Sequence, residues 1–116
     1  MSAMGEMVER RRFPRVTVQG QGRYRKIPIS VKGHRLQNAK IQDVSRGGFR
    51  LQSEEFLKPN SNLLLEMHLP GHPTIRSLVA VSWVNSPPGS DVYDVGGRLI
   101  DPTHETRAAL GRIISG

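Results

Sequence analysis

The sequence has no cysteine, and its four histidines are scattered along the chain. The first absence excludes a disulfide framework and any metal site built on thiolates. Only His68 and His72 are close enough in the sequence to suggest a shared ligand, and they flank the turn signal Pro70-Gly71. We interpret both as solvated turn residues, and we expect no metal site.

Long apolar runs are missing as well. No stretch reaches the length of a membrane-spanning helix. The residues Met1 to Met7 lack the basic region followed by an apolar run that marks a signal peptide. We therefore expect no membrane insertion and a cytoplasmic location. At 116 residues the chain can bury one hydrophobic core and is too short for two.

A catalytic pattern is also absent. Asp43, Ser45 and the histidines form no recognisable arrangement of nucleophile and base, and no paired carboxylates or metal motif occur. We predict that the protein is not an enzyme and needs no cofactor.

Positive charge is abundant, whereas aromatic residues make up only 5% of the chain. With 17 basic and 10 acidic side chains, the net charge is +7, which indicates an anionic partner. Charge alone does not choose between a nucleotide, a nucleic acid and a membrane surface. One hypothesis is a small basic β-barrel that binds single-stranded nucleic acid. The lack of an obvious aromatic stacking platform argues against it.

Apolar and polar residues alternate in six segments, as is typical of half-buried strands. The segments begin near Val16, Leu36, Phe49, Leu63, Ile75 and Val92. We expect Gly20 and Gly22 to mark a bulge or bend in the first of them. In the fifth, the spacing predicts that Val79, Val81 and Trp83 share one face.

A helix is predicted over residues 103–114, with Thr103 as its N-cap. Leu110, Ile113 and Ile114 form an apolar stripe suited to closing one end of a barrel. The predicted fold is therefore mainly all-β, a six-stranded antiparallel β-barrel, closed or split, with a C-terminal α-helix. We divide the chain into a flexible arm, residues 1–8, and one domain, residues 9–116.

Two polar segments carry the chemistry. The first is the arginine cluster of residues 10–15, and arginine binds phosphate bidentately, stacks on purine rings and pairs with guanine. The second is Asp43-Val44-Ser45-Arg46-Gly47-Gly48. A carboxylate at Asp43 can accept from the guanine N1 and N2 hydrogens or hold an arginine, and Gly48 permits close approach of a ligand. The simpler alternative is an ordinary hairpin turn.

Taken together, Arg11-Arg12-Phe13-Pro14-Arg15 and Asp43-Val44-Ser45-Arg46-Gly47-Gly48 resemble the two-part signature of the PilZ domain, RxxxR followed by (D/N)xSxxG. Residues 79–83 and 93–99 resemble the family's central and last strands, so the resemblance covers about residues 9–114. It departs at Gly97 and Leu99, where relatives often carry a larger aliphatic residue and a phenylalanine. That departure affects packing under the helix more than ligand binding.

The resemblance implies a six-stranded barrel that binds the bacterial second messenger cyclic di-GMP. It implies that Arg11 and Arg15 grip the phosphates and stack on guanine, with Arg12 in support. It further implies that Asp43, Ser45 and Gly48 complete the wall on the barrel side. Arg10 stands where a basic residue is associated with two intercalated ligands instead of one. Trp83 has two interpretations, a residue lining the site and a core residue.

The function we predict from this resemblance is a receptor and adaptor. In this hypothesis cyclic di-GMP orders the chain up to Arg15, which we call the arginine-rich arm, on the barrel, and an unidentified effector protein reads the newly fixed surface. Several charge-assisted hydrogen bonds can offset the conformational entropy that the arm loses.

Overall fold

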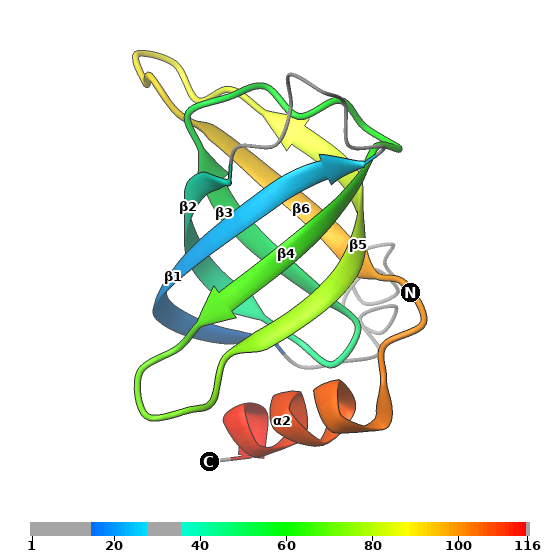
Figure 1. The fold of residues 1–116 in the computed structure, drawn as a ribbon. Helices are drawn as coiled ribbons and strands as arrows, with labels where there is room; N and C mark the ends of the chain where they lie inside the picture. Colours follow the sequence, from blue (N-terminus) through cyan, green and yellow to red (C-terminus); the bar gives the residue numbers. More distant parts are fainter. Residues whose placement is uncertain (1–14, 28–35, 116) are drawn as a thin grey trace, which may run out of the picture.

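The structure is a computed structural model in which residues 15–27 and 36–115 are described. It is a closed antiparallel barrel of six strands, followed by one helix at the C-terminal end of the chain (Figure 1). The elements are β1 (Val16–Ile27), β2 (Gln37–Val44), β3 (Gly48–Ser53), β4 (Asn62–His68), β5 (Ile75–Asn85), β6 (Tyr93–Leu99) and α2 (His104–Ser115). The predicted fold class is confirmed.

The long strand β1 closes the barrel because it pairs with two neighbours. Its first part, from Val16 to Tyr24, pairs with β2, and its second part, from Gln21 to Ile27, pairs with β4. Around the barrel the order is β1-β2-β3-β6-β5-β4, so no strand of the sheet has an open edge.

The core consists mainly of inward side chains from all six strands, as alternation predicted, and α2 adds Leu110 and Ile113. Leu63, Leu65 and Met67 of β4 are fully buried, whereas Leu64 between them faces outward. Two buried glycines of β1 make room for neighbouring side chains. A Cβ on Gly20 would overlap Leu69, and one on Gly22 would lie 2.7 Å from Cδ1 of Ile41.

Irregular pairing interrupts three strands, and each bulge shifts which side chains face the core. In β1 the irregularity lies between Thr17 and Gly20, near the expected position. In β2 it lies between Ile41 and Asp43, and in β5 between Val81 and Trp83. The last two bulges were not predicted.

The β5 bulge corrects one prediction. Val79 and Val81 are buried as expected, but Trp83 is 39% exposed and does not share their face. Val81 pairs with Gly97 and Trp83 with the adjacent Gly96, so Ser82 is the extra residue on β5. The strict period of two is broken there, and the indole lies outside the barrel.

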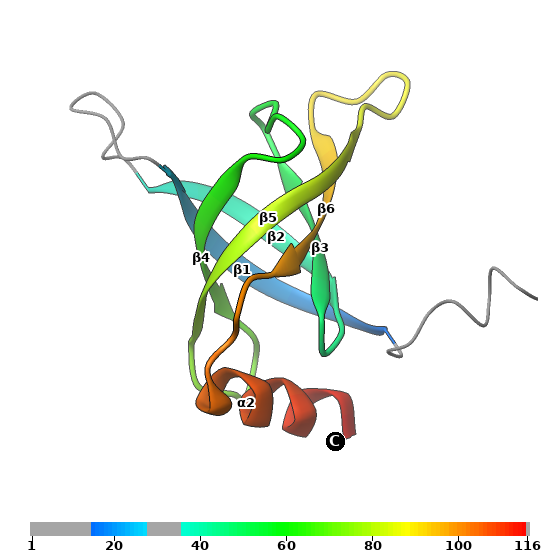
Figure 2. The same cartoon turned by 90° about the vertical axis from the view of Figure 1, so that its right-hand side faces the viewer.

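Helix α2 lies across one end of the barrel (Figure 2). It begins as predicted, because the Thr106 amide donates to Thr103 Oγ1 at 3.1 Å. Leu110 and Ile113 are buried and Ile114 is half-buried, so the predicted apolar stripe is the packed face. Within the described part of the chain, no helix is long and apolar enough to cross a membrane.

The departure at Gly97 has a local explanation. A Cβ at this position would lie 2.5 Å from Cζ of Phe49 and 2.5 Å from the carbonyl oxygen of Ala80. The buried ring of Phe49, which pairs with Gly97 across β3 and β6, thus fills the space that a larger side chain on β6 would need. A larger residue at position 97 would therefore overpack this part of the core.

Candidate functional site

The turn between β2 and β3 is built by Ser45. Its amide donates to the Gly48 carbonyl at 2.9 Å, and its Oγ accepts from the amides of Gly47 at 3.3 Å and Gly48 at 3.0 Å. Residues 45–48 therefore do form the expected hairpin turn, and Ser45 keeps one hydrogen-bonding function beyond it. A hydroxyl has two acceptor lone pairs and one donor hydrogen. With the acceptor capacity taken up by the turn, the chemistry left to Ser45 is donation to an acceptor such as a phosphate oxygen.

Asp43 lies between two arginines and is only 8% exposed. Arg15 Nη1 donates to Oδ1 at 3.1 Å, and Arg50 Nε donates to Oδ2 at 2.9 Å. A nearly buried carboxylate needs such partners to remain charged. Each carboxylate oxygen still has a lone pair for another donor. Asp43 can therefore hold Arg15 against the barrel and accept a hydrogen bond from a ligand at the same time.

The bulge in β2 gives Asp43 this position. Ala39 and Ile41 face the core, and simple alternation would point Asp43 the same way. The irregular pairing between Ile41 and Asp43 instead lets Val44 take the core position, with 0% exposure. Val44 therefore points inward, and Asp43 lies on the other side of the strand.

Cross-strand pairing extends the site from Asp43 across the barrel surface. Asp43 pairs with Arg50, Arg50 with Gly96, and Gly96 with Trp83. We call these four residues the outer row. Gly96 has no side chain to separate Arg50 from Trp83, and a Cβ there would overlap the indole ring. The row therefore places a carboxylate, a guanidinium and an aromatic ring on one stretch of surface.

Gly48 lies one step along the same surface. It pairs with Arg98, and a Cβ on it would lie 2.6 Å from the carbonyl oxygen of Gly97. The close approach of β3 to β6 therefore requires glycine at this position. Arg98 is exposed, so it is a third cation on this face beside Arg15 and Arg50.

The structure thus brings five of the predicted residues to one end and one flank of the barrel. These are Arg15, Asp43, Ser45, Gly48 and Trp83. The other three, Arg10, Arg11 and Arg12, lie outside the described residues.

Sequence reasoning missed Arg50, Arg98 and Gly96. The signal for Arg50 was present, because the hairpin centred on residues 45–48 makes it the cross-strand partner of Asp43. Arg98 and Gly96 depend on the β3–β6 pairing, which joins segments far apart in the sequence.

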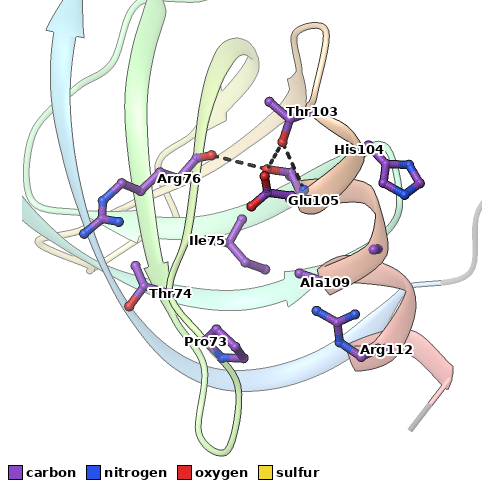
Figure 3. A pocket seen from close by; sticks show the side chains of 11 residues that line it. Pro73, Thr74, Ile75, Arg76, Thr103, His104, Glu105, Ala109 and Arg112 are labelled. Atoms are coloured by element: carbon purple, nitrogen blue, oxygen red, sulfur yellow. Dashed lines mark hydrogen bonds between the residues drawn. The ribbon is translucent and has the colours of Figure 1, made fainter.

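Two hollows lie near this end of the barrel. One, of about 480 Å³, runs along β1 and β2 beside Asp43 and includes Thr17, Gln42 and Arg50 in its lining. A larger one, of about 580 Å³, lies between α2 and the segment joining β4 to β5. Figure 3 shows Ile75, Ala109 and Arg112 in its wall. Among the predicted site residues that the structure describes, none lines the larger cleft.

Comparison with known proteins identifies the family. The family model of the PilZ domain matches residues 9–116. No curated protein sequence matches the chain.

Solved structures with the same fold include the inhibitor of motility MotI/DgrA of Bacillus subtilis, at 15% identity and a TM-score of 0.74. The PilZ domain of YcgR from Escherichia coli with c-di-GMP matches at 14% identity and a TM-score of 0.71. The MrkH–c-di-GMP complex of K. pneumonia matches at 19% identity and a TM-score of 0.70.

These matches cover 91%, 91% and 90% of this chain, respectively. They cover 49% of the MotI chain, 89% of the YcgR domain and 50% of the MrkH chain. The chain therefore spans about half the length of MotI and MrkH. At these identities the likeness establishes the fold.

Proposed function

We propose that this chain, which belongs to the PilZ domain family, is a receptor for cyclic di-GMP. The observation that carries the proposal is the Asp43 carboxylate, nearly buried and held between Arg15 and Arg50 next to the Ser45 turn. Two of the structures that share the fold are described as complexes with this dinucleotide. We propose binding without chemistry, so the ligand leaves unchanged.

Each residue of the site has a role that fits an anionic guanine dinucleotide. Arg15 carries two parallel donors for a phosphate and a flat face for a purine. Ser45 donates its remaining hydrogen to a phosphate oxygen. Asp43 accepts from the guanine N1 and N2 hydrogens with the lone pairs that Arg15 and Arg50 leave unused. Trp83 offers an exposed indole at the far end of the outer row, where a second purine can stack.

The arginine-rich arm completes the site in this proposal. Arg11 grips the phosphates together with Arg15, Arg12 supports them, and Arg10 favours two intercalated ligands. Binding orders the arm on the barrel wall, and an effector protein reads the resulting surface. The Arg15–Asp43 hydrogen bond, at 3.1 Å, is the point at which the arm would join the wall.

Isothermal titration with cyclic di-GMP tests the proposal. Arg15→Ala removes one charge-assisted contact and should weaken binding by about 10- to 100-fold. Arg107→Ala, which removes an exposed arginine from α2, is the matched control and should leave the affinity unchanged. An absence of saturable heat at micromolar ligand would refute the receptor function. The binding stoichiometry of the wild type, compared with that of Arg10→Ala, decides between one and two ligands per chain.

Single-stranded nucleic acid is the rival ligand, and it rests on the barrel fold and the net charge of +7. Filter binding to a mixed-sequence oligonucleotide distinguishes the two. Strong, steeply salt-dependent retention combined with no response to cyclic di-GMP would favour the rival.

A further inference from the structure

A second charged cluster lies on the face formed by β1, β4 and β5, which is turned toward the viewer in Figure 1. Its centre is Glu66, whose neighbours in the pairing are Arg23 on β1 and Arg76 on β5. Arg23 donates to Oε1 through Nη2 at 2.6 Å and Nε at 3.1 Å, and Arg76 Nε donates to Oε2 at 2.9 Å. His68 lies 3.2 Å from Oε1. One carboxylate thus orients two guanidinium groups.

The cluster has more positive charge than it needs for its own pairing. Arg25 lies on the same strand as Arg23, and its Nε is buried with no hydrogen-bond partner among the described residues. The side chain of Arg76 is 72% exposed despite its bond to Glu66. Three arginines therefore line the same hollow as one carboxylate, and only Arg23 and Arg76 are bonded to it.

Exposed leucines lie among these arginines. Leu64 is 44% exposed, and it pairs with Arg25 on one side and Leu78 on the other. Leu36 is 41% exposed and lines the same hollow of about 210 Å³ as Leu64 and the arginines. These two leucines are half of the large hydrophobic residues that are exposed in the described part of the chain. We call Arg23, Arg25, Leu36, Leu64 and Arg76 the basic–apolar patch.

We propose that the basic–apolar patch is a docking surface for an acidic, amphipathic segment of a partner protein. Carboxylates of the partner would meet Arg25 and Arg76, and an apolar side chain would enter the hollow beside Leu64. The charge of the patch selects an acidic partner. A nucleic acid would use the arginines but would leave the leucines without a suitable contact. A second copy of this chain, in a symmetric dimer, would bring the same positive patch against itself.

The patch is separate from the proposed dinucleotide site. Its residues come from β1, β4 and the first part of β5, together with Leu36 before β2. The outer row comes from β2, β3, β6 and the last part of β5. The proposal therefore does not depend on cyclic di-GMP, and its test uses none.

The test is a titration of the full chain, isotope-labelled for NMR, with a short synthetic peptide that carries glutamates and leucines on one helical face. A second peptide, with the leucines replaced by serine, has the same charge. The amides of Arg23, Leu64 and Arg76 should shift with the first peptide. Its affinity should fall about tenfold for Arg76→Ala and for Leu64→Ser, and less than about twofold for Arg107→Ala. Leu64 is 44% exposed and the Arg76 side chain 72% exposed, and neither belongs to the core, so both variants should fold.

Four results would overturn the proposal. Equal losses in Arg76→Ala and Arg107→Ala, or equal affinity for the two peptides, would mean that the protein binds acidic chains through its net charge alone. A mixed-sequence oligonucleotide that binds the same amides more tightly than the leucine peptide would make the patch a nucleic-acid surface. Self-association that Leu64→Ser abolishes would make it an interface between two copies. Because a loss of cyclic di-GMP binding affects none of these readouts, failure here and failure of the receptor function are distinguishable.

Discussion

The Gly48→Ala substitution tests how closely β3 must approach β6 at the proposed site. The added Cβ would lie 2.6 Å from the carbonyl oxygen of Gly97, whereas ordinary van der Waals contact begins at 3.4 Å. The two strands would have to separate locally by about 0.8 Å, or the alanine would have to twist away by the same amount. Neither movement is easy, because the obstacle is backbone within a paired sheet and Leu99 also donates to the Gly47 carbonyl at 3.1 Å.

We expect this substitution to lower the free energy of unfolding by about 1–3 kcal/mol, the usual cost of overpacking. Urea denaturation measures the loss, and the fluorescence of Trp83, the one tryptophan in the chain, reports it. Because the substitution shifts the turn that Ser45 builds, the affinity for cyclic di-GMP should fall as well.

The matched control is Gly111→Ala, the same chemical change inside α2. The nearest atom to its Cβ would be Nη2 of Arg46 at 3.8 Å, so there is room for a methyl group. In a helix interior alanine is favoured over glycine by about 1 kcal/mol. The two variants should therefore move the free energy of unfolding in opposite directions. A Gly48→Ala protein that unfolds at the same urea concentration as the wild type would refute the close-approach argument.

Three further predictions concern polar groups. Tyr24→Phe removes a buried hydroxyl that donates to Glu55 at 2.7 Å, and it should lower the free energy of unfolding by about 1–3 kcal/mol in the same urea assay. The hydrogen bond from Arg23, reinforced by other basic neighbours, lowers the pKa of Glu66 to about 2. Its stabilising effect is thus complete above the ordinary carboxyl pKa of 4.5 and is lost as the pH falls toward 2. Because the arginines are exposed, ionised Glu66 contributes only about 1 kcal/mol to the free energy of unfolding. Glu66→Gln should therefore remove about 1 kcal/mol of the stability that the wild type loses between pH 4.5 and 2, as measured by thermal unfolding. The same pH profile in the variant and the wild type would contradict this role of Glu66. Asp43→Asn should weaken cyclic di-GMP binding by at least about tenfold, whereas an unchanged titration would exclude the proposed guanine contact.

Most of the fold follows from local patterns in the sequence. The strands alternate, the turns carry glycine and proline, and Thr103 caps the only helix of the described residues. Alternation could not locate the bulges in β2 and β5, because a bulge is a property of the pairing between two strands. Trp83 was therefore assigned to the wrong face of its strand, and its place beside Gly96 became visible only from the register of β5 with β6.

The candidate site was predictable in part for the same reason. Asp43, Ser45 and Gly48 lie within one hairpin, and a short motif records their relation directly. Arg50 is within the same hairpin, so its pairing with Asp43 could have been inferred from the turn. The roles of Arg98 and Gly96 arise from contacts between distant strands, which no local pattern records.

The two unpredicted bulges have a common effect on the outer row. Without the irregularity in β2, Asp43 would follow Ile41 toward the core, where a carboxylate without water would require full compensation. Without the one in β5, Trp83 would follow Val81 inward. Each bulge turns one side chain of the proposed site outward at the same level of the sheet, since both residues lie on a single line of cross-strand partners. One extra residue in β2 and one in β5 thus keep Asp43 and Trp83 on the polar face that would bind the ligand, and out of the apolar core that stabilises the barrel.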